Sequence, residues 1–241
     1  MAEHDGFIEG QRAQWSNVAP AWEKWDELLD ACFAFVNYRL VGDARIRRGA
    51  SVLDLGSGTG YPALLAASAV TPGGSVVGVD LSDQMLEVAR RKAEDLKLDN
   101  IEFVASDVTK LDFADETFNA VLSRFCLMFL PDVPAVLAEI ARVLKPGGYL
   151  SCAVWSSIDK NPFITLPIKV LSEYVEVPKP DPDAPGIFRL AQEGDLAAMA
   201  EGTGLRCVTE EEMGATSLYE SEEQYFENLY DLAAPLRPLF D

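Results

Sequence analysis

The chain has 241 residues, of which 49% are hydrophobic and 24% charged, so it can form one large domain or two small ones. It holds 20 lysines and arginines against 39 aspartates and glutamates, a formal net charge of −19. Such a chain would repel polyphosphate, and we therefore expect no nucleic-acid partner.

Few residues are suited to metal binding or to histidine chemistry. The four cysteines form no C-x-x-C pair, which is typical of free thiols in a reducing compartment and predicts a cytoplasmic location. The only histidine, His4, lies near the N-terminus, so we expect no metal site and no Ser-His-Asp triad. We see no signal peptide or long apolar run and expect no stable insertion into a membrane.

The first 45 residues are predicted to form a helical cap, in which Pro20 starts or breaks a helix. Residues 46–241 are predicted to form a second unit, because short β-rich runs there alternate with amphipathic segments. The predicted strands are 51–55, 75–80, 101–105, 118–123 and 149–155. The predicted helices between them are 61–70, 82–96 and 133–144. This alternation indicates a Rossmann-like, doubly wound α/β fold with a mostly parallel sheet.

The last third of the chain is less regular. A proline-rich stretch within 156–190 is predicted to be a substrate-side insertion, with a helix followed by a loop. Two further helices, at 191–201 and 221–239, and a sixth strand at 205–209 are expected. We find no β-rich run after Thr216, so a seventh strand is expected to be missing or the chain to be truncated.

The strongest motif is VLDLGSGTG at positions 52–60, in which a buried strand leads into a glycine loop and then a helix. Glycines let backbone N–H groups approach a ligand, and the helix N-terminus adds positive potential. Asp80 ends the next predicted strand, where a ribose would lie in a Rossmann-type site. A dinucleotide fingerprint would place a third glycine at the position of Tyr61, and Asp54 suits an ammonium better than a pyrophosphate. NAD and FAD are therefore the weaker fit.

Four motifs together resemble those of the class I S-adenosylmethionine (SAM)-dependent methyltransferases. Within that family they are most similar to the ubiquinone/menaquinone C-methyltransferase-like branch. They are VLDLGSGTG, VVGVDLS, VASDVTKLDF and LKPGGYL, and the resemblance covers roughly residues 45–155. It implies that Asp54 and the glycine loop line the methionine end of SAM. It also implies that Asp80 binds both ribose hydroxyls and that Asp107 binds the adenine amino group. The full set implied for cofactor binding is Asp54, Gly56, Ser57, Gly58, Gly60, Asp80, Leu81, Met85, Ser106, Asp107, Val108 and Ser123.

Several of these residues have a plain structural alternative. Met85 lies on a helix face that would be core in any fold, and Asp107 is also a common turn residue. The resemblance implies that Arg124 borders the substrate and that Trp22 lies near the sulfonium, where an aromatic face stabilises a cation. Arg124 could instead pair with a carboxylate, and Trp22 could belong to a packing stripe. Tyr38 is a candidate general base.

The sequence therefore predicts SAM-dependent methyl transfer to a small molecule, at a carbon, nitrogen or oxygen atom that the sequence leaves open. After the fourth strand the chain reads Ser123-Arg124-Phe125-Cys126 instead of the NPP-aromatic motif of nucleic-acid amino-methyltransferases. With histidine effectively absent, an acceptor that is already nucleophilic is favoured. Two alternatives stay open: a SAM-binding protein without transferase activity and, less favoured, an NAD(P)-binding oxidoreductase. The oligomeric state is unknown.

Overall fold

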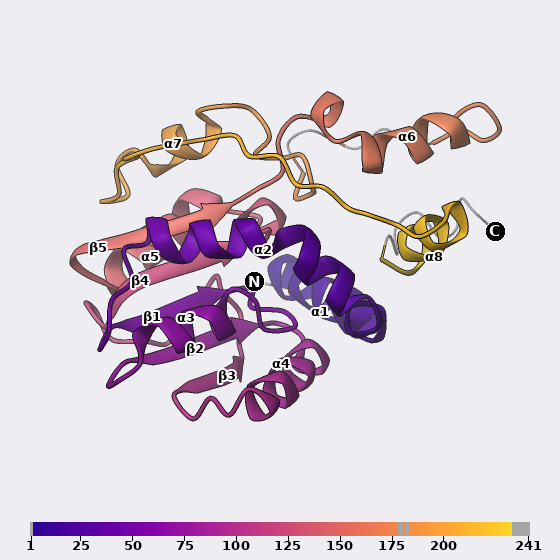
Figure 1. Ribbon diagram of the computed structural model, residues 1–241. Coiled ribbons are helices and arrows are strands. Elements are labelled where there is room, and N and C mark those ends of the chain that lie inside the picture. Colours follow the sequence, from indigo (N-terminus) through magenta and orange to yellow (C-terminus); the bar gives the residue numbers. More distant parts are fainter. Residues whose placement is uncertain (1, 178–180, 182–183, 233–241) are drawn as a thin grey trace.

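A computed structural model describes residues 2–177, 181 and 184–232, and its centre is one parallel sheet (Figure 1). The strands are β1 (Ser51–Leu55), β2 (Ser75–Asp80), β3 (Ile101–Ala105), β4 (Phe118–Arg124) and β5 (Leu144–Ala153). Their order is β3-β2-β1-β4-β5 and every neighbouring pair is parallel. The central strand is buried on both faces, and Val52, Leu53 and Leu55 are inaccessible to solvent.

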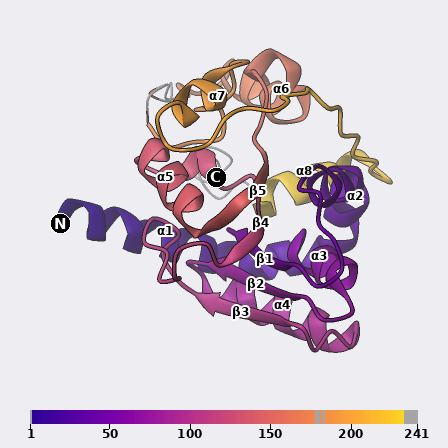
Figure 2. The same ribbon diagram turned by 90° about the vertical axis from the view of Figure 1, so that its left-hand side faces the viewer.

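Helices cover both faces of the sheet. One face is packed by α2 (Asp26–Asp43), α3 (Ala63–Val70) and α4 (Asp83–Asp95), and the other by α5 (Val133–Val143) (Figure 2). In α5 the apolar residues follow the period of a helix, and Asp132 caps its first turn by accepting from the Ala135 N–H at 3.0 Å. The predicted doubly wound, Rossmann-like α/β fold is confirmed.

The prediction for Pro20 is wrong, because one helix, α1 (Ala2–Lys24), runs straight through this residue. A proline inside a helix removes one backbone hydrogen bond. Tertiary packing holds the helix together here: Val18 and Ala19 are buried against Met85 of α4. Local propensity is outweighed by these contacts.

The predicted sixth strand at 205–209 is also wrong. This segment pairs with no strand in the part of the chain that the structure describes, and Val208 is 63% exposed. The remaining elements are α6 (Pro162–Leu171), α7 (Asp195–Ala200) and α8 (Glu222–Leu232), with short 3-10 turns η1 (Leu127–Phe129) and η2 (Ile158–Lys160). The predicted helix 221–239 is described only to Leu232, and the remainder of it, like the end of the chain, lies outside the described residues.

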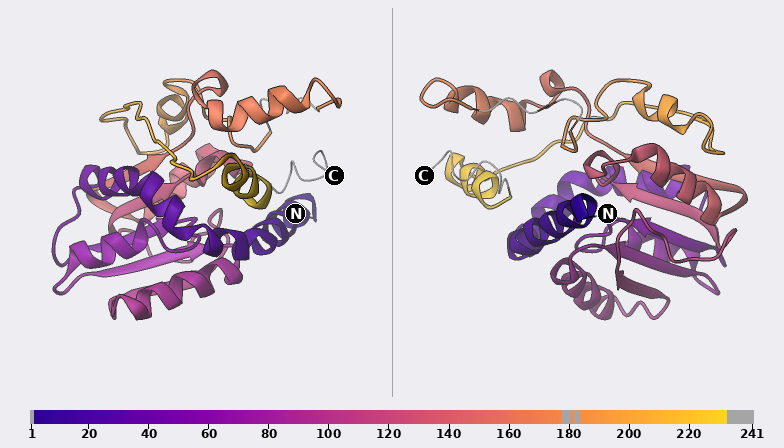
Figure 3. Two further views of the ribbon diagram at one scale, coloured as in Figure 1. Left: turned by 45° about the vertical axis from the view of Figure 1, so that its right-hand side comes forward. Right: turned by 180° about the vertical axis from the view of Figure 1, so that it is seen from behind.

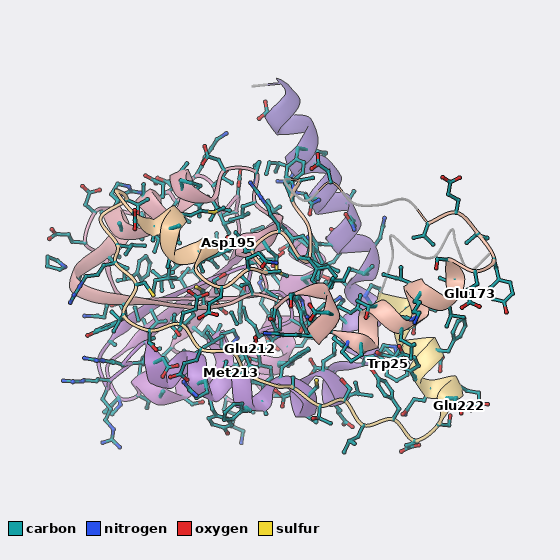
Figure 4. All side chains as sticks on the ribbon, turned by 90° about the horizontal axis from the view of Figure 1, so that it is seen from above. Trp25, Glu173, Asp195, Glu212, Met213 and Glu222 are labelled. Carbon is teal, nitrogen blue, oxygen red and sulfur yellow. The ribbon has the colours of Figure 1, made fainter. Side chains whose placement is uncertain are left out.

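Beyond the carboxyl ends of the strands lie α1, α6 and α8 (Figures 1 and 3). The end of α1 contacts α8: Lys24 Nζ lies 2.6 Å from Glu227 Oε1 and 2.7 Å from Asp231 Oδ2. Trp25 Nε1 donates to Asp231 Oδ2 at 2.8 Å, and Figure 4 shows Trp25 beside α8. Tyr225 of α8 donates to the Phe163 carbonyl of α6 at 2.7 Å. Among the described helices, none has both the length and the apolar composition needed to cross a membrane.

Candidate functional site

The loop after β1 lies against the end of β2. The Gly56 and Ser57 N–H groups both donate to the Val79 carbonyl, at 2.8 and 3.0 Å. Gly56 has φ +69°, and a Cβ there would come within 2.6 Å of Cys126 Cβ, so the backbone requires glycine. Gly58 has φ +51°, and a Cβ there would meet nothing within 4 Å. The loop is packed on one side and faces open space on the other.

Asp80, the last residue of β2, joins this loop to the next one. Its Oδ2 accepts from the Gly58 N–H at 3.0 Å and its Oδ1 from the Ser82 N–H at 2.9 Å, while its carbonyl accepts from the Ser106 N–H. Burial raises the pKa of Asp80, and the N–H donors oppose that rise. These residues meet at the carboxyl edge of a parallel sheet, which is where α/β proteins bind their ligands.

Asp54 lies inside the sheet, with no exposed surface. Its Oδ2 accepts from the Ala63 N–H at 3.1 Å, at the start of α3, whereas Oδ1 has no hydrogen-bond partner among the described residues. Burial raises the pKa of Asp54 to about 8, and the charge of Arg124 opposes the rise. Ser57 Oγ is likewise buried and unpartnered within the described chain, and Ser123 at the end of β4 is fully buried. Buried polar atoms without partners are rare, and together they indicate a ligand.

The helix α1 lies against the loop that follows β2. Ser16 Oγ lies 3.1 Å from Ser82 Oγ, and Arg12 Nε donates to the Leu81 carbonyl at 3.3 Å. Met85 is buried against α1, so the structure gives it a core role. Trp22 is half-buried on α1 and packs edge-on to Trp15, with ring centroids 6.4 Å apart. Its Nε1 is buried without a partner among the described side chains.

The loop after β3 holds the predicted adenine contacts. Asp107 Oδ1 accepts from the Thr109 N–H at 2.8 Å and from Thr109 Oγ1 at 2.7 Å, so Asp107 shapes the turn. Val108 is buried with the residues of α5, and Ser106 is half-buried beside Asp80. The turn role of Asp107 is established by these bonds, and its adenine contact stays a prediction.

Arg124 ends β4 on the other side of the glycine loop. Its Nη1 donates to Oδ1 of Asn37 on α2 at 2.9 Å, and its guanidinium lies 5.6 Å from the centre of the Phe33 ring. Arg124 forms no ion pair with a carboxylate among the described residues. The alternative in which Arg124 only pairs with a nearby carboxylate is therefore not observed. Tyr38 is 66% exposed on α2 and is not brought to the other candidates.

An aromatic cluster next to Arg124 was missed by sequence reasoning. Phe125 stacks on Trp155 with ring centroids 4.6 Å apart and planes 8° apart, and Phe33 meets both rings edge-on. Phe163 of α6 tilts against Trp155 at 5.2 Å. Asn37 was missed too, although it is a polar residue on the buried face of α2, one turn after Phe33, which is a readable signal.

A separate cleft of about 380 Å³ lies at the other end of the sheet. It is lined by residues just before β4 and at the start of β5, so it faces away from the glycine loop. Ligands of open α/β sheets bind at the carboxyl ends of the strands, so we do not assign this cleft to the reaction.

Comparisons with known proteins bear on this arrangement. Residues 53–152 match the family model described as a methyltransferase domain. The chain is 40% identical over 108 residues to a demethylmenaquinone methyltransferase of Listeria welshimeri, covering 45% of this chain and 46% of that protein. It is 39% identical over 157 residues to one from Staphylococcus aureus, covering 63% of each. The chain thus spans about half to two thirds of the length of these relatives.

Solved structures agree on the fold. A SAM-dependent methyltransferase from Aquifex aeolicus superposes with a TM-score of 0.54 at 24% identity, covering 70% of this chain and 79% of that one. A chain from a complex with the Haloferax volcanii Trm112 methyltransferase activator superposes with a TM-score of 0.62 at 20% identity, covering 90% and 92%. The glycine loop, the acidic residue after β2 and the family match agree with one another: residues 53–152 are similar to a methyltransferase domain.

Proposed function

We propose that this chain transfers the methyl group of SAM to a small aromatic acceptor of the quinone type. The observation that carries the proposal is the pairing of the Gly58 N–H with the Asp80 carboxylate, beside a loop that faces open space. The matched relatives are named for action on demethylmenaquinone, which supports a naphthoquinone-type ring as the acceptor class. The atom that receives the methyl group is left open.

The residues at the carboxyl edge fit SAM by the chemistry of their donors and acceptors. Asp54 has a buried unpartnered oxygen that suits the ammonium group, and Ser57 has a buried hydroxyl that suits the carboxylate or its water. Asp80 would accept hydrogen bonds from the ribose hydroxyls, and Ser106 and Asp107 would flank the adenine. The remaining proposed contacts are Gly56, Gly58, Gly60, Leu81, Met85, Val108 and Ser123.

SAM supplies a methyl group on a sulfonium, whose carbon–sulfur bond breaks with the electron pair staying on sulfur. The acceptor donates the electron pair of the new bond, so the protein has to align the two and exclude water. We propose that residues 1–45 form a cap that aligns the acceptor with SAM and excludes water. In support, α1 is hydrogen-bonded to the loop after β2 and carries Trp22, whose ring suits a nearby cation.

The proposal includes a small-molecule acceptor rather than nucleic acid, supported by the net charge of −19. It also includes a cytoplasmic location, supported by four cysteines that are all free. The relatives and the sequence give no support for an NAD(P)-dependent oxidoreductase.

The first test is calorimetric titration of the chain with SAM, with its demethylated product S-adenosylhomocysteine and with NAD. We expect micromolar binding of the first two and none of NAD. The second test supplies SAM labelled on its methyl group together with 1,4-naphthohydroquinone, catechol or a small amine, followed by chromatography of the products. Label in the naphthohydroquinone supports the proposal, whereas label found only in protein or nucleic acid would refute it.

A further inference from the structure

Asn37 is a buried amide whose orientation is fixed by its neighbour. It is 2% exposed, and its Oδ1 accepts from Arg124 Nη1 at 2.9 Å. A guanidinium only donates hydrogen bonds, so the oxygen of the amide has to face Arg124. The nitrogen Nδ2 then points elsewhere, and it has no hydrogen-bond partner among the described residues. A buried amide donor without an acceptor destabilises a protein, which indicates that a ligand supplies the acceptor.

Arg124 adds a positive charge beside this donor. It is half-buried at the end of β4, and desolvation lowers its pKa while the charges of Asp54, Asp30 and Asp26 raise it. Its one hydrogen bond within the described chain, to Asn37, uses one of five N–H donors. The pair therefore offers several donors and a cation to an incoming group, and an anionic oxygen is the group that matches them.

The surroundings of the pair favour the methyl acceptor over the cofactor as the source of that oxygen. The glycine loop and Asp80 lie on the β1–β2 side, whereas Arg124 leads into the aromatic cluster on the β4–β5 side. Phe33 lies one turn before Asn37, below the guanidinium, and packs edge-on against Phe125. A flat aromatic ring that bears an ionised oxygen fits both features at once.

We propose that Asn37 Nδ2 and the Arg124 guanidinium bind the ionised oxygen of the methyl acceptor, a phenolate or enolate on an aromatic ring, next to the cluster of Phe33, Phe125, Trp155 and Phe163. This inference rests on the proposed function. Holding the acceptor in its ionised form makes its ring and oxygen nucleophilic without a histidine, and the chain has only His4. Asn37 and Arg124 are then residues that bind and orient the acceptor.

The test uses a matched pair of probes in the presence of S-adenosylhomocysteine. One is 2-hydroxy-1,4-naphthoquinone, which is ionised at neutral pH, and the other is neutral 1,4-naphthoquinone. Calorimetry or the absorbance of the coloured anion gives the dissociation constants for the wild type, Asn37→Leu and Arg124→Met. We expect the variants to bind the anion about tenfold or more weakly, while their affinity for the neutral probe changes by no more than about twofold.

Asn228 provides a matched control. It is also a buried amide with an unpartnered Nδ2, but its Oδ1 accepts from the Tyr219 hydroxyl instead of an arginine. Asn228→Leu should leave the binding of both probes unchanged. If Asn37→Leu or Arg124→Met does not fold, as seen by thermal unfolding, Arg124→Lys and Asn37→Ser are measured in its place.

A comparison of S-adenosylhomocysteine with 5′-methylthioadenosine, which lacks the carboxylate, separates the two sources of the oxygen. If the variants weaken the former about tenfold and spare the latter, the pair serves the cofactor and the inference is overturned. Equal effects on both naphthoquinones, or binding of neither by the wild type, also overturn it. If the wild type binds no S-adenosylhomocysteine, the proposed function itself fails.

Discussion

The Gly58 N–H donates to the Asp80 carboxylate at 3.0 Å, so this side chain joins the backbone bonds to the Val79 carbonyl in holding the loop after β1 against the end of β2. The same carboxylate also accepts from the Ser82 N–H, which leads into α4. Asp80 therefore shapes two loops as well as offering acceptors to a ligand.

Replacing Asp80 should disable cofactor binding. We expect Asp80→Ala to weaken SAM binding by about one hundredfold, because hydrogen bonds to a charged group contribute about 1.5–3 kcal/mol each. Calorimetric titration measures the loss. The exposed neighbour Asp83, which pairs with Arg90 at 3.0 Å, is the control, and Asp83→Asn should bind SAM as the wild type does. Unchanged binding in Asp80→Ala would contradict the proposed ribose contact.

Asp54 should make the unliganded protein less stable as the pH rises. Its pKa is about 8 in the folded state against an ordinary value of 3.8, so between these values the unfolded state has lost a proton that the folded state keeps. Stability then falls as the pH rises from about 4 to about 8 and changes no further above that. Asp54→Asn should remove this slope and raise the free energy of unfolding by about 1–3 kcal/mol near pH 8.5, with little effect near pH 4.

Urea unfolding of both proteins across this pH range measures the difference. Asp43→Asn, an exposed carboxylate that pairs with Arg39, serves as the control and should leave the slope in place. A variant whose pH profile parallels that of the wild type would show that Asp54 is ionised in the unliganded fold.

The affinity for SAM should rise with pH if Asp54 binds the ammonium group. The ionised carboxylate is the form that attracts a cation, and its pKa is about 8 without ligand, so binding at neutral pH releases a proton. Titrations in buffers of different ionisation enthalpy count that proton. We expect the affinity to increase up to about pH 8 and then level off, and Asp54→Asn to show neither the increase nor the proton release. An affinity that is flat with pH in the wild type would argue for a different partner.

Gly56 should tolerate alanine poorly, for a reason beyond its dihedral angle. A Cβ at Gly56 would lie 2.6 Å from both Cβ and Sγ of Cys126, whereas at Gly73, with φ +85°, it would meet nothing within 4 Å. Gly73→Ala then measures the cost of a left-handed residue alone, about 1–2 kcal/mol. Gly56→Ala should cost about 1–3 kcal/mol more because of overpacking, as read from urea unfolding. Equal losses at the two sites would mean that the loop shifts away from Cys126 freely.

The contact between α1 and α8 should matter for local order more than for global stability. Lys24→Met combined with Trp25→Phe removes the bonds to Glu227 and Asp231, and ion pairs at exposed positions contribute little to global stability. We expect a small change in unfolding free energy but faster amide hydrogen exchange in α8. Arg39→Met, which breaks a comparable pair with Glu211, should leave exchange in α8 as it was. If α8 exchanges equally in all three proteins, other contacts hold it.

Much of the fold could be predicted from the sequence, because the spacing of hydrophobic residues and the glycines at turns are local signals. The first three strands were predicted at the residues where they occur. The fifth begins earlier than predicted, because Leu144 pairs with Phe118, and the Lys-Pro-Gly-Gly segment forms an irregularity before regular pairing resumes at Tyr149. The errors share a cause: a strand at 205–209 needs a neighbour to pair with, and the helix through Pro20 needs α4 to support it.

The site was only partly predictable. Asp54, within β1, and Asp80, the last residue of β2, belong to local motifs that can be recognised in the sequence. Asn37 can be read from the sequence only as a polar residue on the apolar face of a helix, because its partner Arg124 is 87 positions away and meets it only in the folded chain. Trp155 and Phe125 likewise meet only because β4 and β5 are adjacent and parallel.

The helix α1 contacts both the loop after β2 and the helix α8. Near its middle Ser16 contacts the loop after β2, and at its end Lys24 holds α8. If α1 moved to admit the cofactor, the contact of Lys24 with Glu227 would pass the displacement to α8. Cofactor and acceptor would then bind cooperatively, each changing the affinity of the other by the same factor, as thermodynamic linkage requires.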